Sequence, residues 1–86
     1  MSRNVKVSNV EVSLTPKEFD LLVYLVKNKK QVMTREQLLS KVWGFDYYGD
    51  VRTVDTHIKS LRERLNESRK CIKTVWGIGY KFEDDI

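Results

Sequence analysis

An apolar stripe in residues 51–66 constrains the fold of this 86-residue chain more than any other feature. With about 100° of rotation per residue, one side of a helix here would collect only apolar side chains. These are Val51, Val54, Ile58, Leu61 and Leu65. Such a stripe has to be covered by other elements, so we predict a helix from about Asp50 or Val51 to Asn66 that packs on a core.

The polar side of this helix combines hydroxyl groups with cations. It presents Arg52, Thr56, Lys59, Ser60 and Glu63, with Thr53, His57 and Arg64 along one flank. Hydroxyl and Lys side chains can reach base edges in the major groove of DNA, and Arg, Thr and His can bind phosphate oxygens. A face that is merely solvated would more often show Glu and Lys four residues apart, and Lys59 with Glu63 is one such pair. DNA recognition and a solvated surface both stay open on this pattern alone.

Three further residues of the helix have separate expected roles. Asp55 lies near the positive start of the helix, and Arg62 is expected in an ion pair or against an aromatic face. His57 is either a residue at the edge of the core or a phosphate donor. Because no Ser, Cys or carboxylate pair is spaced around His57 as a nucleophile and base, we predict no catalytic residue and no enzyme activity.

The residues at the start of the chain predict a hairpin followed by a helix. Valines alternate with polar residues on both sides of Ser8-Asn9, which is typical of a β-hairpin. The capping box Thr15-Pro16-Lys17-Glu18 then opens a helix of about 12 residues, and cations at 27–30 complement its negative end. The apolar residues at helical spacing are Phe19, Leu22, Val23 and Val26.

The next segment predicts a second helix and a loop. Residues 31–33 are expected to form a short extended link. A second capping box, Thr34-Arg35-Glu36-Gln37, opens a helix that Gly44 ends. One side of this helix carries Leu38, Leu39, Val42 and Trp43. Residues 44–50 form a loop that is bounded by glycines and rich in aromatic side chains.

The C-terminal part predicts a second hairpin. β-like segments at 71–75 and 80–83 flank Trp76-Gly77-Ile78-Gly79, where the glycines suit a tight turn. A phosphate-binding glycine loop is the weaker interpretation, because no helix follows the two glycines. Trp76 either folds back on the core or contacts a sugar-phosphate wall or a minor groove of DNA. The order of hairpin, three helices and hairpin predicts one α+β domain over residues 1–86 with the layout of a winged helix.

Charge and cysteine content narrow the function classes. The net charge is +4, and residues 51–81 hold eight Lys or Arg against three acidic residues, whereas the tail Glu83-Asp84-Asp85 is acidic. A polyanion would be attracted to the basic end of the molecule. Cys71 is the single cysteine, which excludes an internal disulfide, and with one His it leaves no zinc set, so neither a metal nor another cofactor is expected. Without an apolar run that could span a bilayer, or a visible signal peptide, we expect a cytoplasmic protein with no membrane partner.

Several segments resemble the OmpR/PhoB-type effector domains of bacterial response regulators, in order and in spacing, over residues 14–82. They are LTPKEFDLL at 14–22, TREQLL at 34–39, VWG at 42–44, RTVDTHI at 52–58 with Leu61-Arg62, and TVWGIGY at 74–80. The resemblance implies a winged helix-turn-helix domain that binds double-stranded DNA sequence-specifically and regulates transcription in a two-component system. Residues 51–66 would be the recognition helix in the major groove, and residues 71–83 the wing on the adjacent minor groove.

The resemblance also implies roles for individual residues. The base-reading positions would be Thr56, Lys59 and Ser60. The phosphate-contacting positions would be Trp43, Arg52, Thr53, His57, Thr74 and Tyr80, and we include the neighbouring Lys73 in this set. The wing turn would contribute Trp76 and Gly77. In activators of this family the loop 44–50, here with Phe45, Asp46, Tyr47 and Tyr48, faces RNA polymerase.

Family members bind direct-repeat half-sites as head-to-tail pairs after phosphorylation of an N-terminal receiver domain. The isolated domain is therefore expected to be monomeric. The receiver domain is absent and only two strands precede residue 14, so we expect an excised fragment that begins inside the natural sheet. Trp76 and Ser60 also stand where relatives carry Arg, which argues against a charged minor-groove contact and a strong guanine contact. The alternative function is a winged-helix protein-interaction module that docks through loop 44–50.

Overall fold

The N-terminal hairpin is present as predicted. A computed structural model of the chain describes residues 3–7 and 10–83. Strands β1 (Arg3–Val7) and β2 (Val10–Leu14) pair antiparallel, with Arg3 opposite Leu14 and Val7 opposite Val10. The predicted turn at Ser8-Asn9 lies outside the described residues, as does most of the acidic tail. Leu14 at the end of β2 is fully buried and brings this hairpin onto the core.

Helix α1 (Pro16–Lys27) has the predicted start and length. The Thr15 hydroxyl accepts a hydrogen bond from the Glu18 amide at 3.2 Å, and the Glu18 carboxylate accepts one from the Thr15 amide at 2.9 Å. The predicted apolar series does not mark the buried side, however, because Leu21, Leu25 and Glu18 are buried while Val26 is exposed. Apolar residues surround most of this helix, so their spacing gives its length but not its orientation.

The second helix has the predicted extent but is less regular than predicted. The capping box at Thr34 and Gln37 is confirmed and opens α2 (Arg35–Leu38), which continues as a π-helix, η1 (Leu39–Trp43), up to Gly44. Gly44 has a φ of 107°, a conformation that favours glycine, and it ends the helix as predicted. The expected link before the helix instead contains strand β3 (Met33–Thr34), which pairs with a strand near the C-terminus.

Helix α3 (Arg52–Leu65) confirms the predicted stripe. Val54, Ile58, Leu61 and Leu65 are buried, and Val51, just before the helix, is half-buried. A 3₁₀ helix that the sequence did not indicate, η2 (Asn66–Cys71), follows directly.

The C-terminal hairpin consists of β4 (Ile72–Val75) and β5 (Gly79–Phe82), and β5 is central in a sheet of order β3-β5-β4. Both glycines of its turn serve backbone geometry, as predicted. Gly77 has a φ of 79°, and a Cβ at Gly79 would overlap the carbonyl oxygen of Met33 on the adjoining strand. The close approach at Gly79 is what admits β3 to the sheet.

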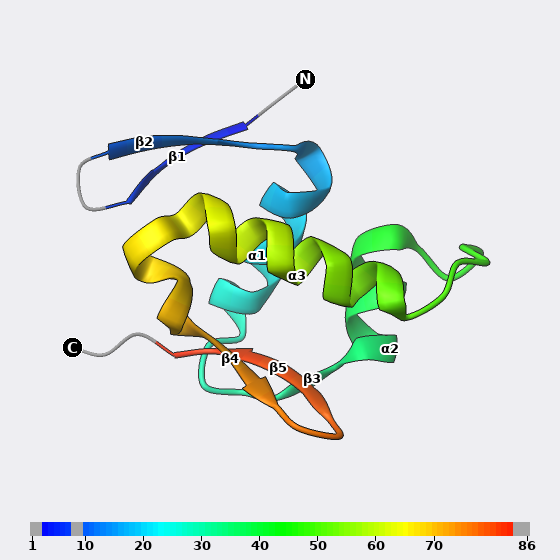
Figure 1. The fold of residues 1–86 in the computed structure, drawn as a ribbon. Coiled ribbons are helices and arrows are strands. Elements are labelled where there is room, and N and C mark those ends of the chain that lie inside the picture. Colours follow the sequence, from blue (N-terminus) through cyan, green and yellow to red (C-terminus); the bar gives the residue numbers. More distant parts are fainter. Residues whose placement is uncertain (1–2, 8–9, 84–86) are drawn as a thin grey trace.

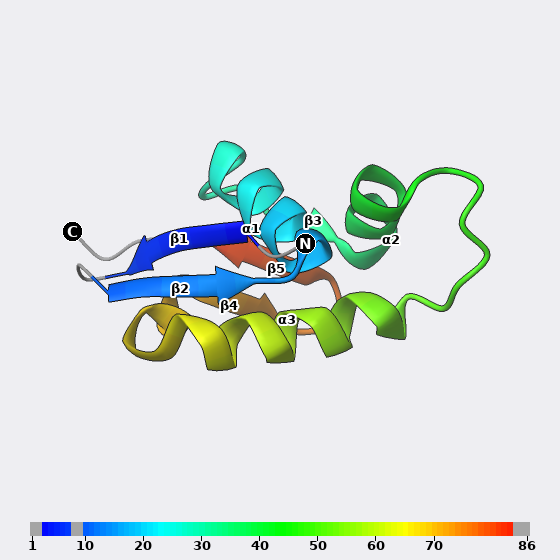
Figure 2. The ribbon, with the colours of Figure 1, turned by 90° about the horizontal axis from the view of Figure 1, so that it is seen from above.

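The core lies between the two β-structures. In Figure 1 the β1–β2 hairpin is above α1 and α3, and the sheet β3-β5-β4 is below them. The buried side chains come from α1, α2, α3 and the strands on both sides. The loop 44–50 projects away from the body at the start of α3 in both Figure 1 and Figure 2. The predicted order of hairpin, three helices and hairpin is therefore confirmed.

Candidate nucleic-acid interface

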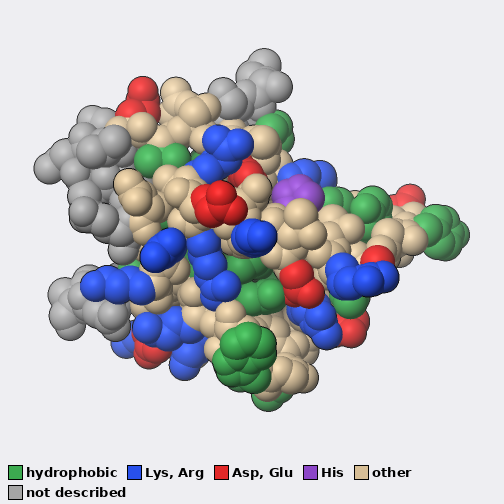
Figure 3. All heavy atoms as spheres, viewed as in Figure 1, with side chains coloured by type: hydrophobic (Ala, Val, Ile, Leu, Met, Phe, Trp, Pro, Cys, Tyr) green, Lys and Arg blue, Asp and Glu red, His purple; other side chains and the backbone are tan. Residues whose placement is uncertain are grey.

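The outer side of α3 is open to solvent. Thr56 and Lys59, two of the predicted base-reading residues, are exposed, while Ser60 is half-buried. The C-terminal hairpin packs along the Asp55 and Arg62 flank of the helix and leaves this outer side uncovered. Figure 3 shows this face of the molecule, with Lys and Arg side chains gathered over α3 and between α3 and the hairpin. The structure thus presents a basic, hydroxyl-bearing helix face beside a protruding hairpin.

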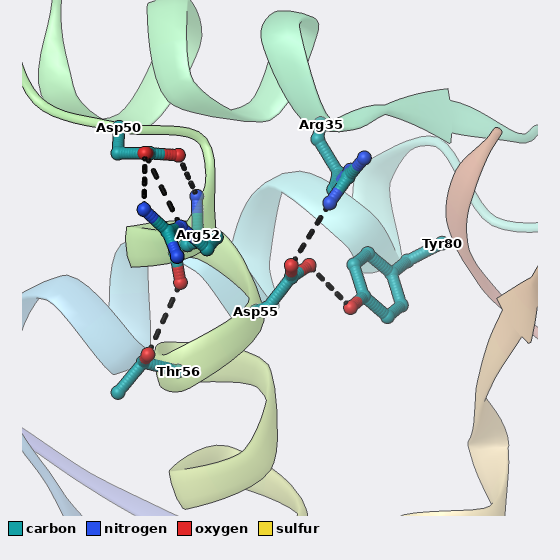
Figure 4. A network of polar contacts seen from close by, with 6 residues as sticks. All are labelled: Arg35, Asp50, Arg52, Asp55, Thr56 and Tyr80. Carbon is teal, nitrogen blue, oxygen red and sulfur yellow. Dashed lines mark hydrogen bonds and ion pairs between the residues drawn. The ribbon is translucent and has the colours of Figure 1, made fainter. Parts of the chain in front are cut away.

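The hydroxyl of Thr56 has a defined hydrogen-bonding state. It donates its proton to the backbone oxygen of Arg52 at 3.1 Å, one turn earlier in the helix (Figure 4). Its oxygen lone pairs and its methyl group still point outward with the exposed side chain. Thr56 can therefore accept a hydrogen bond from a base amino group or contact a thymine methyl group.

Arg52 at the start of α3 is held by an acidic residue that the sequence analysis did not single out. The Asp50 carboxylate accepts hydrogen bonds from the Arg52 backbone amide at 2.9 Å and from its guanidinium at 3.0 and 3.2 Å (Figure 4). The hydrogen bond from the Arg52 backbone amide, followed by those from the Arg52 guanidinium, lowers the pKa of Asp50. The hydrogen bond to the Asp50 carboxylate in turn raises the pKa of Arg52. An acidic residue just before a helix start is a recognisable capping signal, and here it also reaches the side chain of Arg52.

A second group lies on the flank of α3 opposite to Asp55 and Arg62. It consists of His57 and Thr53 of α3 together with Trp43. The Nδ1 atom of His57 is 2.8 Å from the Thr53 carbonyl oxygen, so the proton is assigned to Nδ1, which donates to that oxygen. The His57 ring meets the Trp43 ring edge-on, with centroids 4.9 Å apart. Lys17 lies 5.9 Å from the Trp43 ring centroid and donates to the Val42 carbonyl at 2.9 Å. His57 and Trp43 are both half-buried, so packing and phosphate contact are compatible for them.

A polar network joins α3 to the C-terminal hairpin. Arg62 donates to the Ile72 carbonyl at 2.7 and 3.1 Å and to the Thr74 hydroxyl at 2.8 Å, and its guanidinium lies 5.6 Å from the Tyr80 ring centroid. The predicted structural role of Arg62 against an aromatic face is confirmed. Thr74 accepts in this arrangement and keeps its own hydroxyl proton to donate elsewhere. The arginine therefore sets the position of β4 relative to α3.

Tyr80 takes part in the same joint and is buried. Its hydroxyl donates to Asp55 at 2.6 Å, and Asp55 also forms an ion pair with Arg35 at 3.0 Å (Figure 4). Burial, followed by the hydrogen bond to Asp55, raises the pKa of Tyr80 to about 12. The only proton of the Tyr80 hydroxyl is used within the protein, which conflicts with its predicted contact to a phosphate. Tyr80 and Asp55 instead connect β5 with α3, and Arg35 adds the start of α2.

The two protruding turns carry large exposed aromatic side chains. Trp76 at the hairpin turn is 88% exposed, which excludes the alternative that it folds back on the core. In the loop 44–50, Phe45 is 90% and Tyr48 is 99% exposed. Tyr47 is more covered, and its ring lies 6.4 Å from that of Trp43.

Residues 3–7 and 10–83 contain no group of three His, Cys, Asp or Glu side chains that could hold a metal ion. Over the same residues, no helix has the length and apolar character needed to cross a membrane. An open groove between α3, η2 and β4 is lined mainly by charged groups, which are Asp55, Lys59, Arg62, Glu63, Arg69 and Lys70. Half-buried Lys73 lies on β4 nearby.

The arrangement of a three-helix core, an exposed third helix and a β-hairpin beside it defines a winged helix-turn-helix domain. Comparison with known proteins gives the family. Residues 9–82 match the family described as "Transcriptional regulatory protein, C terminal". The chain is 56% identical over 86 residues to the transcriptional regulatory protein SrrA of Staphylococcus aureus (strain NCTC 8325 / PS 47). The matched region covers 95% of this chain and 36% of SrrA. The chain thus spans about a third of the length of the curated relatives it matches.

Solved structures agree with this assignment. The DNA-binding domain of Klebsiella pneumoniae RstA, solved in complex with the RstA box, has 37% identity and a TM-score of 0.81, covering 94% of this chain and 83% of that one. The response regulator DrrB of Thermotoga maritima, an OmpR/PhoB homologue, has 37% identity and a TM-score of 0.79, covering 88% of this chain and 36% of DrrB. This chain belongs to the family of C-terminal domains of transcriptional regulatory proteins, of the OmpR/PhoB type. The fold and the family resemblance expected from the sequence are both confirmed.

Proposed function

We propose that this domain binds double-stranded DNA sequence-specifically, with α3 in the major groove and the β4–β5 hairpin on the adjacent minor groove. The observation that carries the proposal is the division of α3 into a buried apolar side and an exposed side with Thr56 and Lys59. The major groove is about 12 Å wide and admits an α-helix, and hydroxyl and Lys side chains match groups on base edges. The DNA-binding domain of RstA, a relative of similar fold that was solved in complex with the RstA box, supports DNA binding by this domain.

Within this proposal the residues of the interface divide into two sets. Thr56, Lys59 and Ser60 contact bases, and the half-buried position of Ser60 gives it the smallest share. The phosphate-contacting set is Trp43, Arg52, Thr53, His57, Lys73 and Thr74. We leave Tyr80 out of this set because its hydroxyl proton is donated to Asp55. Tyr80 acts instead by holding the wing in position beside α3. We further propose that the domain has no enzyme activity.

The proposal is tested by selection of bound sites from a random duplex pool, followed by titration of the selected and a scrambled duplex. Lys59→Ala is expected to change the preferred sequence at one or two base pairs, because a base contact is worth about 1–3 kcal/mol of discrimination. The matched control is Lys27→Ala, an exposed Lys on α1, which lies behind α3 in Figure 1. Loss of selectivity in both variants, or equal binding of selected and scrambled duplexes by the native domain, would contradict the proposal.

The function of the whole protein follows from the same family relationship. We propose that the domain is the output half of a response regulator in a two-component system of a bacterial cytoplasm. Two copies would occupy direct-repeat half-sites head to tail when a receiver domain pairs them, while the isolated domain is monomeric. Artificial dimerisation tests this head-to-tail arrangement, because tethering raises the effective concentration of the second copy. It should tighten binding only on direct repeats with the correct spacing.

A second candidate role is docking of a protein partner through loop 44–50. The exposed rings of Phe45 and Tyr48 favour it, since large aromatic side chains anchor many interfaces. RNA polymerase is the partner we propose, in addition to DNA. Phe45→Ala with Tyr48→Ala is expected to abolish activation in a reconstituted transcription assay and to leave DNA affinity unchanged. A fall in DNA affinity of similar size would place the loop on DNA instead.

A further inference from the structure

Asp50 forms two kinds of contact at the start of α3. One carboxylate oxygen accepts from the Arg52 backbone amide, and the Asp50 carbonyl accepts from the Thr53 amide at 3.0 Å, so Asp50 satisfies two free amides in the first turn of α3 in the manner of a capping residue. The other carboxylate oxygen accepts from Nε and Nη2 of Arg52. The cap stabilises the helix, whereas the ion pair occupies a cation that faces solvent.

This ion pair lies on the exposed surface. The Arg52 side chain is 82% exposed and that of Asp50 is 54% exposed. In Figure 4 the pair stands at the start of α3 beside Thr56, apart from the Arg35–Asp55–Tyr80 network. Any phosphate that approaches Arg52 therefore meets a guanidinium whose Nε and Nη2 edge is already filled by a carboxylate.

We propose that Asp50 competes with DNA phosphate for the guanidinium of Arg52 and so lowers the sequence-independent part of the affinity. The inference rests on the proposed DNA-binding function. A guanidinium offers the same two-pronged edge to a carboxylate and to a phosphate, and it cannot give that edge to both. A phosphate that takes this edge leaves the Asp50 carboxylate unpaired beside the DNA backbone, where the two negative charges repel.

The competition changes the balance between phosphate and base contacts. Phosphate contacts favour every sequence equally, and base contacts favour only the correct one. A carboxylate that weakens one phosphate contact leaves the contribution of Thr56 and Lys59 unaffected. Asp50 would thereby reduce binding to random DNA and keep the discrimination of the outer face of α3.

Asn is the substitution that separates the two contacts of Asp50. It caps helices as well as Asp does, so Asp50→Asn keeps the helix start and removes the charge. Asp46→Asn is the matched control, because it makes the same change of net charge at another exposed Asp of the same loop. Arg52→Ala and the double variant Asp50→Asn with Arg52→Ala complete a double-mutant cycle. Thermal melting of each variant reports whether the fold is retained.

The measurement is the affinity for a random-sequence duplex as a function of salt concentration. An exposed ion pair is weak, so Asp50→Asn is expected to tighten binding only about two- to fivefold at low salt. The plot of log affinity against log salt should steepen by about 0.9, the value for one further neutralised phosphate. Asp46→Asn should show a smaller gain with an unchanged slope, and once Arg52 is Ala the gain from Asp50→Asn should fall to about that of Asp46→Asn.

Three results would overturn the inference while leaving DNA binding intact. Weaker binding by Asp50→Asn would mean that the carboxylate orients Arg52 toward DNA. A gain that persists undiminished in the Arg52→Ala background would mean simple charge repulsion. Failure of the proposed function is distinct, because then the native domain would bind no duplex at low salt. Unchanged affinity of Arg52→Ala alone would remove Arg52 from the phosphate set and the competition with it.

Discussion

Removal of the Tyr80 hydroxyl should destabilise the domain, because a hydrogen bond to a charged group is lost. Tyr80 is buried, and its hydroxyl donates to the Asp55 carboxylate at 2.6 Å. A hydrogen bond to a charged group contributes about 1.5–3 kcal/mol. We therefore expect Tyr80→Phe to lower the free energy of unfolding by about 1.5–3 kcal/mol. Burial, followed by this hydrogen bond, also raises the pKa of Tyr80 from 10.0 to about 12.

The same reasoning predicts how this loss depends on pH. The pKa of Tyr80 is higher in the folded than in the unfolded chain, so folding favours the protonated hydroxyl. Its stabilising contribution is fully present below pH 10 and is lost as the pH rises from about 10 to about 12. The stability difference between native and Tyr80→Phe should thus be constant near neutral pH and shrink above pH 10. Other groups that titrate in this range are common to both proteins and cancel in the difference.

The assay is denaturant unfolding at a series of pH values, together with the tyrosinate absorbance of the folded protein. Tyr48→Phe is the matched control, because Tyr48 is 99% exposed and its hydroxyl loss should change stability by less than about 0.5 kcal/mol. In the absorbance titration, one of the four tyrosines should ionise late in the native protein and be missing in Tyr80→Phe. A stability loss below about 0.5 kcal/mol at neutral pH, or no late tyrosine, would refute the reasoning.

Three more predictions address other contacts of the fold and the wing. Arg62→Met should lower the free energy of unfolding by about 2 kcal/mol in a denaturant titration, because the Ile72 carbonyl loses a charged donor. Arg64→Ala should destabilise the fold more than Glu18→Gln does, because it leaves the buried Glu18 carboxylate without the cation that lies 2.9 Å away. Equal losses of unfolding free energy in the two variants would show that this carboxylate is solvated. Trp76→Ala should weaken DNA binding without changing the slope of log affinity against log salt, whereas Trp76→Arg should steepen this slope by about 0.9. A shallower slope for Trp76→Ala would show that the indole positions a nearby cation against a phosphate.

Local signals in the sequence were sufficient to predict where α1 and α2 start. A capping box links residues three apart, so Thr15 and Thr34 marked the starts of α1 and α2 without any knowledge of the fold. The orientation of α3 could also be predicted, because only one side of this helix is apolar. Helix α1 differs in this respect, because apolar residues occur on several of its sides and their spacing does not identify the buried side.

Two of the features that sequence analysis missed depend on distant contacts. Strand β3 has two residues, too few for a periodic pattern, and it forms because Gly79 admits it to the sheet. The joint between α2, α3 and the wing links Asp55 to Arg35 across 20 residues and to Tyr80 across 25. A sequence pattern names the charges but not their partners at such separations. For this reason the resemblance placed Tyr80 on DNA, whereas its hydroxyl is bound inside the protein.

The way α3 is held explains why so few of its residues remain for DNA. Arg64 ties one flank to α1, and Arg62 and Asp55 tie the other to the wing. Because these groups are paired within the protein, they fix the orientation of the helix before any DNA is present. Thr56 and Lys59 are exposed, and surface substitutions away from buried pairs change stability by no more than about 0.5 kcal/mol. If Thr56 and Lys59 read bases as proposed, folding and recognition are carried by different residues of one helix, and base preference can change on this scaffold without loss of the fold.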